Sequence, residues 1–404
     1  MGTGSDSNIV DTMLEGRYWS TFRIQSFVEQ TRSLVIRFQT KHDLYIQSFS
    51  EIPRFLTYVC KRLLGKSNLR MIQAQELCTA IAKKIEQRRD FPSREIEFPR
   101  EVSPWDAATN CFQRHGFYPI SFVSINSIKQ PDTGIRPQMF SRIIPGAAYE
   151  FFDEDSYYDS YANSEFAFTY KKNGWDSFRN LEIISSGAVP LYLDAKSIPR
   201  FIMTFYPKKY LSSLMTEFRE SQFRLNHASK QFFFDWCLKY LQTQFLYEYL
   251  RELSSFSGRE ILFLDDSLDE RPDYMSMMVL ISLVRHHDSK VYLTRKYRYL
   301  TEETKFTSEQ FLYGRGFGYR GRLVGASNIV FSKEVEIIRG FTGEVVIGNV
   351  NRNMAKLNEL NKSKMKTISI WGEDFAPRKS VLKLMQQNSH RVFIRELNYP
   401  FVVP

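Results

Sequence analysis

The stretch that decides the fold runs from 143 to 199 and reads IIPGAAYEFFDEDSYYDSYANSEFAFTYKKNGWDSFRNLEIISSGAVPLYLDAKSIP. Within it, the apolar strand FAFTY precedes the loop KKNGWDS, the helical segment FRNLEIISS, a glycine and a second apolar strand, AVPLYLD. This order predicts a β-α-β unit with a right-handed crossover. The loop KKNGWDS then follows the carboxyl end of a parallel strand, where ligands of such sheets bind.

This loop and the start of the helix combine positive charge with a helix N-terminus. Lys171, Lys172 and Arg179 supply cations, and the free N–H groups of the first turn add the positive end of the helix dipole. Glu182 follows Arg179 by one helical turn, so its carboxylate lies on the same face. These groups suit a nucleotide, with the diphosphate beside the cations and the ribose beside Glu182. The alternative is an exposed Arg–Glu pair followed by a C-cap glycine.

The segment NSEFAFTYKKNGWDSFRNLEIISSGAVPLYL (163–193) resembles the donor-binding motif of GT-B glycosyltransferases, particularly the exostosin-like group. In that group a strand, an S-x-R-x-x-E helix and a G-x-x-P-V strand hold the nucleotide-sugar. The matching residues here are Ser177, Arg179, Glu182, Gly187 and Pro190. The resemblance implies that Glu182 binds the ribose and Arg179 the diphosphate. We therefore expect a donor-binding set of Lys171, Lys172, Asp176, Ser177, Arg179 and Glu182.

The chain departs from the exostosin-like order, because a second series of apolar strands follows the motif instead of preceding it. Its strands are expected at ILFLDD (261–266), KVYLT (290–294), NIVF, GEVVIGNV (343–350), TISIWG (367–372) and RVFIREL (391–397). Helical segments between several of them predict a second doubly wound parallel sheet. Sugar-acid (Kdo) transferases of bacterial surface polysaccharide, which also have an altered GT-B architecture, are a looser comparison.

The expected fold is therefore α/β, with two Rossmann-like doubly wound domains in a modified GT-B-like order. A chain of 404 residues exceeds the size of a single core. We expect a helical N-terminal region over 1–100, in which short strands at Leu34–Phe38 and Leu44–Gln47 are an option. A nucleotide-sugar-binding domain is expected over 101–256 and an acceptor-side domain over 257–404, the two facing each other across a cleft.

Two acidic stretches are candidates for catalysis. Asp153 and Asp155 have the spacing of a metal-binding DxD motif, but an acidic helix N-terminus is the preferred interpretation, since the Arg–Glu motif indicates metal-free donor binding. Asp155 stays a candidate base for an acceptor hydroxyl. Asp265 and Asp266 end the strand ILFLDD, where a carboxylate acts as base or nucleophile, or else caps the next turn.

The loop YGRGFGYRGR (313–322) combines alternate glycines with arginines and tyrosines. Backbone N–H groups and guanidinium forks of this kind bind a phosphate or an anionic sugar, so Arg315, Tyr319 and Arg320 are candidates for acceptor or phosphate binding. The loop also resembles RNA-binding RGG segments. It is a single short copy inside a folded series, so nucleic acid is not the expected partner.

The bulk composition sets limits on the partners and the location. The net charge of +10 favours a negative partner such as a nucleotide, an anionic glycan or an anionic membrane face. Four scattered cysteines without CxxC spacing indicate neither a disulfide framework nor a zinc site. The longest apolar run is too short to span a membrane, and the N-terminus does not resemble a signal peptide. A cytoplasmic protein is expected, with peripheral membrane contact as an option.

Together these features predict a glycosyltransferase that moves a sugar from a nucleotide-sugar to a glycan or glycolipid hydroxyl, in surface polysaccharide or glycoconjugate synthesis. No cofactor is expected, and a divalent metal is not needed, since cations and a helix N-terminus stabilise the leaving phosphate. The alternative is a non-catalytic protein on a transferase-like fold that binds RNA or anionic polysaccharide.

Overall fold

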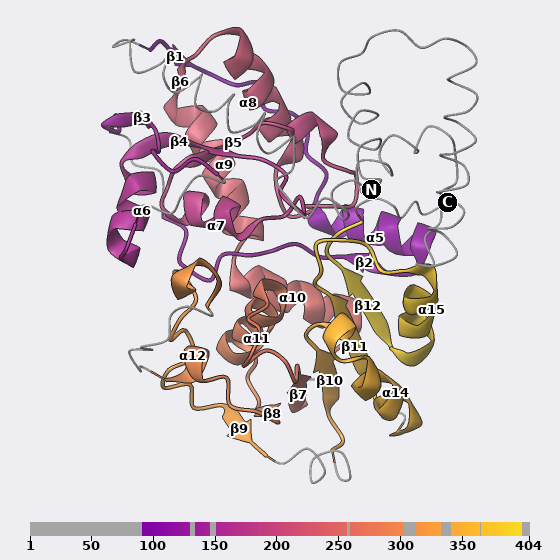
Figure 1. Ribbon diagram of the computed structural model, residues 1–404. Coiled ribbons are helices and arrows are strands. Elements are labelled where there is room, and N and C mark those ends of the chain that lie inside the picture. The colour runs from indigo at the N-terminus through magenta and orange to yellow at the C-terminus, as the bar shows by residue number, and fades with distance from the viewer. Residues whose placement is uncertain are drawn as a thin grey trace, which may run out of the picture.

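The computed structural model describes residues 91–397, except 130–133, 146–150, 257–258, 303–311, 333–340 and 364. The helical region predicted for the N-terminal residues therefore lies almost entirely outside the described residues. The described chain is a mixed α/β structure in which every paired strand runs parallel to its neighbour. Figure 1 shows two lobes, with a smaller sheet in the upper lobe and a larger sheet in the lower one.

The larger sheet has seven strands in the order β2-β12-β11-β10-β7-β8-β9. Read from β9 to β12, this is the 3-2-1-4-5-6 order of the Rossmann fold, with the reversal between β7 and β10. The parallel α/β sheet predicted for the second half of the chain is confirmed. Its strands are β2 (Tyr118–Pro119), β7 (Ile261–Leu264), β8 (Val291–Leu293), β9 (Ile329–Phe331), β10 (Glu344–Ile347), β11 (Thr367–Trp371) and β12 (Arg391–Ile394).

Helices cover both faces of this sheet, because its strands are apolar on both sides. In β7, Leu262 and Leu264 pack into one buried cluster with α14 and α15, whereas Ile261 and Phe263 pack into another with α11. Figure 1 accordingly shows α14 and α15 on one side of the strands and α11 and α12 on the other. These helices are α11 (Tyr274–His286), α12 (Arg298–Thr301), α14 (Met354–Ser363) and α15 (Lys379–Asn388).

The smaller sheet contains the predicted β-α-β unit. Strand β4 (Ser164–Thr169), helix α7 (Phe178–Ser185) and strand β5 (Val189–Tyr192) follow one another, and β3 (Gln138–Phe140) pairs with the other edge of β4. Gly187, at φ +81°, ends the unit's helix, as the sequence indicates. The remaining elements of this lobe are β1 (Ser93–Arg94), α6 (Glu154–Ala162), α8 (Lys208–Glu220), β6 (Arg224–Leu225) and α9 (His227–Tyr240).

The smaller sheet is not doubly wound in the described residues, which corrects the prediction for 101–256. Its order, β3-β4-β5, is sequential and contains no reversal. The apolar segment ISFVSI (120–125) adds no strand to it, because these residues cross between the lobes and form only an isolated bridge from Ser124 to Gln242. Their side chains are nevertheless buried, so the apolar pattern reflects a core-crossing segment.

Residues 104–119, which form a helix and a short strand, belong to the larger lobe. Helix α5 (Pro104–His115) ends at Gly116 in the left-handed conformation, and the next residues form β2, which pairs with β12 at the edge of the larger sheet. Figure 1 shows α5 and β2 beside α15 and β12, although their indigo and violet colours mark them as early in the chain. The pairing of β2 with β12 therefore carries residues 104–119 into the larger lobe.

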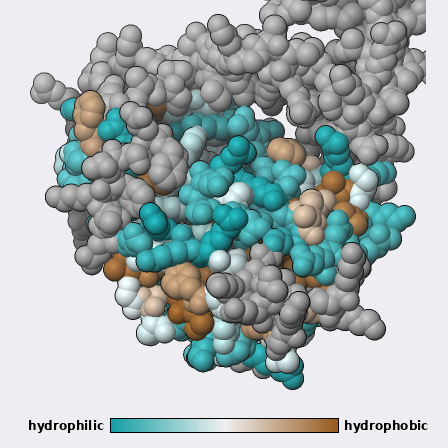
Figure 2. Space-filling view, turned by 60° about the horizontal axis from the view of Figure 1, so that its bottom comes forward, coloured by the Kyte–Doolittle hydropathy of each residue, from teal (hydrophilic) through white to brown (hydrophobic). Residues whose placement is uncertain are grey.

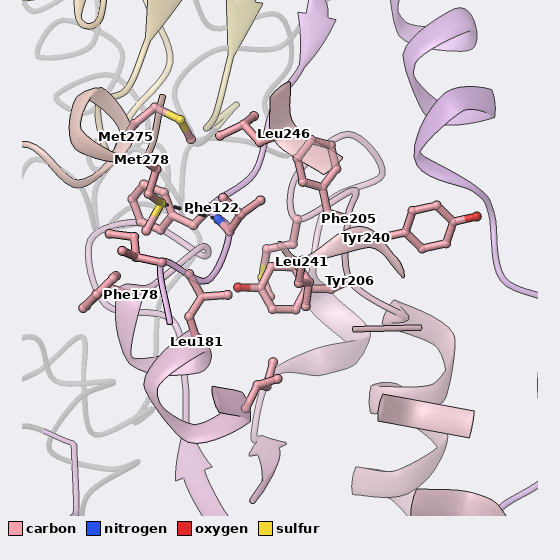
Figure 3. Close-up of a cluster of buried hydrophobic side chains, with 14 of the residues drawn as sticks. Phe122, Phe178, Leu181, Phe205, Tyr206, Tyr240, Leu241, Leu246, Met275 and Met278 are labelled. Atoms are coloured by element: carbon pink, nitrogen blue, oxygen red, sulfur yellow. Dashed lines mark hydrogen bonds between the residues drawn. The ribbon is translucent and has the colours of Figure 1, made fainter. Parts of the chain in front are cut away.

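A continuous hydrophobic cluster joins the two lobes. Phe122 lies in the crossing segment, Phe178 and Leu181 come from α7, and Met275 and Met278 come from α11. Figure 3 shows these side chains pointing toward one another, together with Leu246 of α10 (Thr243–Ser254). The Val123 N–H donates a hydrogen bond to Sδ of Met278 at 3.4 Å. The helix that carries the candidate site is thus packed directly against the larger lobe.

The lower face of the molecule carries mostly hydrophilic side chains. Figure 2 shows this face with teal predominant and brown restricted to small patches. Among the described helices, none is long and apolar enough to cross a membrane.

Candidate functional site

Helix α7 begins without a side-chain cap at the carboxyl end of β4. Its N-cap residue, Ser177, has extended backbone angles, but its hydroxyl makes no capping hydrogen bond. By contrast, Asp153 caps α6 and Asp273 caps α11 through their carboxylates. The start of α7 therefore keeps N–H groups that no N-cap side chain satisfies, which favours an anion at this point.

The guanidinium group of Arg179, in the first turn of α7, is shielded from solvent, but two of its nitrogen atoms lack hydrogen-bond partners among the described residues. Its Nε and Nη1 atoms are buried and have no hydrogen-bond partner among the described residues. The negative charges that Tyr161, Tyr157 and Glu182 carry when ionised raise its pKa against the effect of burial. A buried guanidinium without partners costs free energy, so this position is suited to an anionic ligand.

Glu182 lies one turn further along α7 and is 9% exposed. Its Oε2 atom accepts a hydrogen bond from the Tyr157 hydroxyl at 2.8 Å, and its Oε1 atom accepts none among the described residues. Burial raises the pKa of Glu182 to about 7, although the Tyr157 hydroxyl and the positive charges of Arg179 and Lys172 lower it. One carboxylate oxygen is thus fixed by Tyr157 and the other is available to a ligand.

The lysines of the loop differ in their surroundings. Lys171 lies over the ring of Trp175, with Nζ 5.0 Å from the ring centroid. Burial and the charge of Arg179 lower the pKa of Lys172 to about 8, against the opposing charges of Glu182 and Asp374. Lys172 therefore belongs to the same charged cluster as Arg179 and Glu182, whereas Lys171 is held at its edge.

Asp176 has a structural position at the junction of the lobes. It is 2% exposed, and its Oδ2 atom accepts a hydrogen bond from the Phe122 N–H at 2.6 Å. Its own N–H donates to Oε1 of Glu396 at 2.7 Å, and its carbonyl accepts from Nη1 of Arg395 at 2.8 Å. Burial raises the pKa of Asp176 to about 6, an effect that the charge of Arg395 opposes. These contacts fix the loop before α7 to the carboxyl end of β12.

The acidic candidates lie in three different surroundings. Asp153 and Asp155 sit at the N-terminus of α6, where Asp153 accepts a hydrogen bond from the Ser156 N–H at 2.7 Å and Asp155 is exposed. Asp265 is fully buried and accepts hydrogen bonds from Ser276, Asn353 and Ser267. Burial raises its pKa. Asp266 faces Lys356 at 3.5 Å and Arg295 at 3.8 Å.

The loop at 313–322 lies against α6 and α7, but its candidate residues are placed differently from one another. Tyr319 is fully buried and donates a hydrogen bond to the Tyr313 carbonyl at 2.7 Å. Arg315 lies over the ring of Phe152, 5.0 Å from its centroid, and Arg320 is exposed. The buried ring of Tyr319 packs edge-on to Phe178 at the start of α7. The loop is therefore connected to the candidate site through its aromatic residues.

Several residues of this region were not predicted from the sequence to belong to the site. Tyr157 holds Glu182, and Asp374 and Arg395 approach the loop KKNGWDS from the ends of β11 and β12. A side chain at Gly174 would lie 2.9 Å from Oδ1 of Asp374. The aromatic run around Tyr157 was visible in the sequence, whereas the approach of Asp374 and Arg395 depends on how the lobes pack.

Among the described residues, no group of three or more histidines, cysteines and carboxylates is placed to hold a metal ion. Comparison with protein-family models, with curated proteins and with solved structures finds no match for this chain. The candidate site therefore consists of an uncapped helix start, Lys172, Arg179 with two nitrogens that no described residue binds, and Glu182 with one oxygen that accepts no hydrogen bond from the described residues.

Proposed function

We propose that the protein is a glycosyltransferase whose nucleotide-sugar donor binds at the start of α7. The supporting observation is the pairing of an unsatisfied guanidinium with a half-satisfied carboxylate on one helical face. Among the described residues, two buried nitrogens of Arg179 have no hydrogen-bond partner, and Glu182 has one oxygen bound by Tyr157 and one that accepts no hydrogen bond. A diphosphate would satisfy Arg179 and the free N–H groups of the helix start, and a ribose diol would donate to Glu182.

The cations near this site would stabilise the leaving phosphate. Lys172 shares the charged cluster with Arg179, so a departing nucleotide would meet two positive charges and the positive end of the helix dipole. In this proposal no divalent metal is required for the leaving group. The exostosin-like pattern of Ser177, Arg179 and Glu182 gives independent support from the sequence.

The larger sheet would present the acceptor. Its strands β11 and β12 end beside the donor loop, where Asp374 and Arg395 both come close to Gly174. The side chain of Asp374 is 47% exposed, so a substrate hydroxyl could reach its carboxylate. Its Oδ1 atom is paired with Nη2 of Arg395. Asp265 is fully buried and bound by three hydrogen-bond donors, so a substrate hydroxyl has no access to it. We therefore place Asp374 ahead of Asp265 as the carboxylate that accepts the acceptor's proton.

The test is nucleotide binding by thermal shift and calorimetry, with UDP, GDP, CDP, dTDP and CMP and their common sugars. We expect one base to stabilise the wild type, with and without EDTA. Glu182→Gln keeps an acceptor for Tyr157 but loses the charge. Because hydrogen bonds to charged groups contribute about 1.5–3 kcal/mol, it should weaken binding by roughly tenfold to a hundredfold. Glu220→Gln, an exposed carboxylate on α8, is the matched control.

Two results would contradict the proposal. Absence of any nucleotide-dependent shift in the wild type would remove the donor site. Binding that is unaffected in Glu182→Gln and falls steeply with salt would instead favour the RNA- or polysaccharide-binding alternative. If a nucleotide-sugar binds, sugar transfer in Asp374→Asn then tests the acceptor side, and a wild-type rate in that variant would exclude Asp374 as the base.

A further inference from the structure

The glycine–arginine loop, residues 312–325, packs closely on α6. Its backbone is left-handed at several residues, and at Gly318 (φ +81°) a Cβ atom would lie 2.4 Å from the Tyr158 hydroxyl. Asn126 donates a hydrogen bond to the same hydroxyl at 3.3 Å. Only a glycine allows the loop backbone to approach α6 this closely. The loop is therefore held in a defined position that places its N–H groups beside the helix.

One carboxylate, that of Glu154, is bound by this loop as an anion. The Gly318 N–H donates a hydrogen bond to Oε1 of Glu154 at 3.1 Å, and Nη2 of Arg322 lies 3.7 Å from the same oxygen. A second guanidinium, that of Arg285, donates a hydrogen bond from Nη1 to the Ile125 carbonyl at 2.8 Å, next to Asn126. A backbone N–H of a left-handed glycine combined with arginine is a donor set that proteins use for phosphate.

This carboxylate lies next to the candidate donor site. Tyr158 lies between them, because its hydroxyl is against Gly318 of the loop and its ring packs edge-on to Tyr157, with 5.5 Å between ring centroids. Phe317 of the loop packs on Tyr157, with 5.7 Å between ring centroids, and Tyr157 donates its hydrogen bond to Glu182. Neighbouring tyrosines of α6 therefore connect the loop's anion contact with the carboxylate proposed to bind ribose.

The contact with Glu154 is weak enough to be exchanged. The side chains of Arg322 and Glu154 are 35% and 36% exposed, and ion pairs at this exposure contribute little because water screens them. Glu154 brings a single negative charge, whereas a diphosphate brings more charge and more acceptor oxygens. We propose that the Gly318 N–H and Arg322 form a second anion site, which Glu154 occupies as an internal stand-in until a substrate phosphate replaces it.

The proposal that this anion belongs to a nucleotide rests on the proposed function, but the site itself does not. Inorganic pyrophosphate is therefore the first probe, by calorimetry at low salt. Glu154→Gln should tighten pyrophosphate binding by about two- to fivefold, because the competing charge is removed. Arg322→Gln should weaken it by about tenfold, and Arg322→Lys supplies a second variant if the first unfolds.

A double variant decides whether the two residues act together. If Glu154 acts by holding Arg322, the gain in Glu154→Gln disappears when Arg322→Gln is also present. Asp159→Asn is the matched control, since it removes one exposed charge from the same helix away from the loop. Equal affinities in Glu154→Gln and Asp159→Asn would overturn the proposal. So would a gain that survives in the double variant.

Nucleotide binding separates this inference from the proposed function. If a nucleoside diphosphate binds in a Glu182-dependent manner and Glu154→Gln leaves both its affinity and that of pyrophosphate unchanged, the second anion site is wrong and the donor site stands. If pyrophosphate shows the predicted pattern and no nucleoside diphosphate binds more tightly than pyrophosphate, the anion site stands and the donor assignment fails.

Discussion

Replacing Glu396 by glutamine should make folding stability less dependent on pH. Glu396 is fully buried at the junction of the lobes, where its Oε1 atom accepts the Asp176 N–H at 2.7 Å and lies 3.4 Å from Nη1 of Arg395. Burial raises the pKa of Glu396 to about 8, and the charge of Arg395 offsets this only in part. Glutamine keeps the acceptor oxygen and adds an N–H group in place of the hydroxyl of the protonated acid.

The direction in which pH changes folding stability follows from the raised pKa of Glu396 in the folded state. The stabilising contribution of Glu396 to the free energy of unfolding is fully present below its ordinary pKa of 4.5, and it is lost as the pH rises through about 8. Each pH unit inside this window costs about 1.4 kcal/mol, so the wild type loses roughly 2–3 kcal/mol through this group between pH 5.5 and 7.5. Asp176 and Glu182 also have raised pKa values, but both residues are present in the wild type and in Glu396→Gln. Their effects on stability therefore largely cancel in the comparison.

Urea unfolding of wild type and Glu396→Gln at pH 5.5, 6.5 and 7.5 measures this difference, with Glu220→Gln as a surface control. We expect the free energy of unfolding of the variant to rise relative to the wild type by about 2–3 kcal/mol across the range. A difference that stays constant with pH would refute the reasoning. A loss of about 3–5 kcal/mol in the variant at pH 7.5 would show instead that Glu396 is ionised and paired with Arg395.

Three further predictions concern the same junction and the loop beside it. Gly174→Ala should lower the free energy of unfolding by about 1–3 kcal/mol, measured in urea, since its Cβ would lie 2.8 Å from Oε1 of Glu396; unchanged stability would mean that the loop shifts freely. Phe122→Ala should cost about 3–5 kcal/mol in the same assay, because its ring fills the core between the lobes, and a loss under 1 kcal/mol would contradict that role. Nucleotide affinity should fall between pH 7 and 9 as Lys172, with its pKa near 8, loses its charge; calorimetry should find no such fall in Lys172→Met.

Local patterns in the sequence predicted the elements that local chemistry determines. The β-α-β unit around α7 and most strands of the larger sheet follow from apolar runs separated by helical segments, and both are present. Asp153 and Asp155 also lie at a helix N-terminus, as expected, and the Asp153 carboxylate caps α6. In each case a few neighbouring residues carry the whole signal.

Long-range contacts determine the parts of the fold that local patterns do not indicate. Residues 120–125 form only an isolated bridge, and their burial comes from packing between α7 and α11. Strand β2 has only two residues and joins a partner near the other end of the described chain, so no local pattern could indicate its sheet. The contacts of Asp176 with Arg395 and Glu396 depend on the same long-range pairing.

The order in which the ribosome releases the chain gives the pairing of β2 with β12 a further consequence. Pro119 pairs with Ile394, so the edge of the larger sheet stays incomplete until almost all of the described chain has emerged. Among the described strands, β3, β4 and β5 pair only with one another, so the smaller sheet can form first, whereas the loop before α7 gains its contacts with Arg395 and Glu396 only after β12 is made. During synthesis, α5 and β2 therefore cannot complete their packing against α15 and β12 until the final strand has been made.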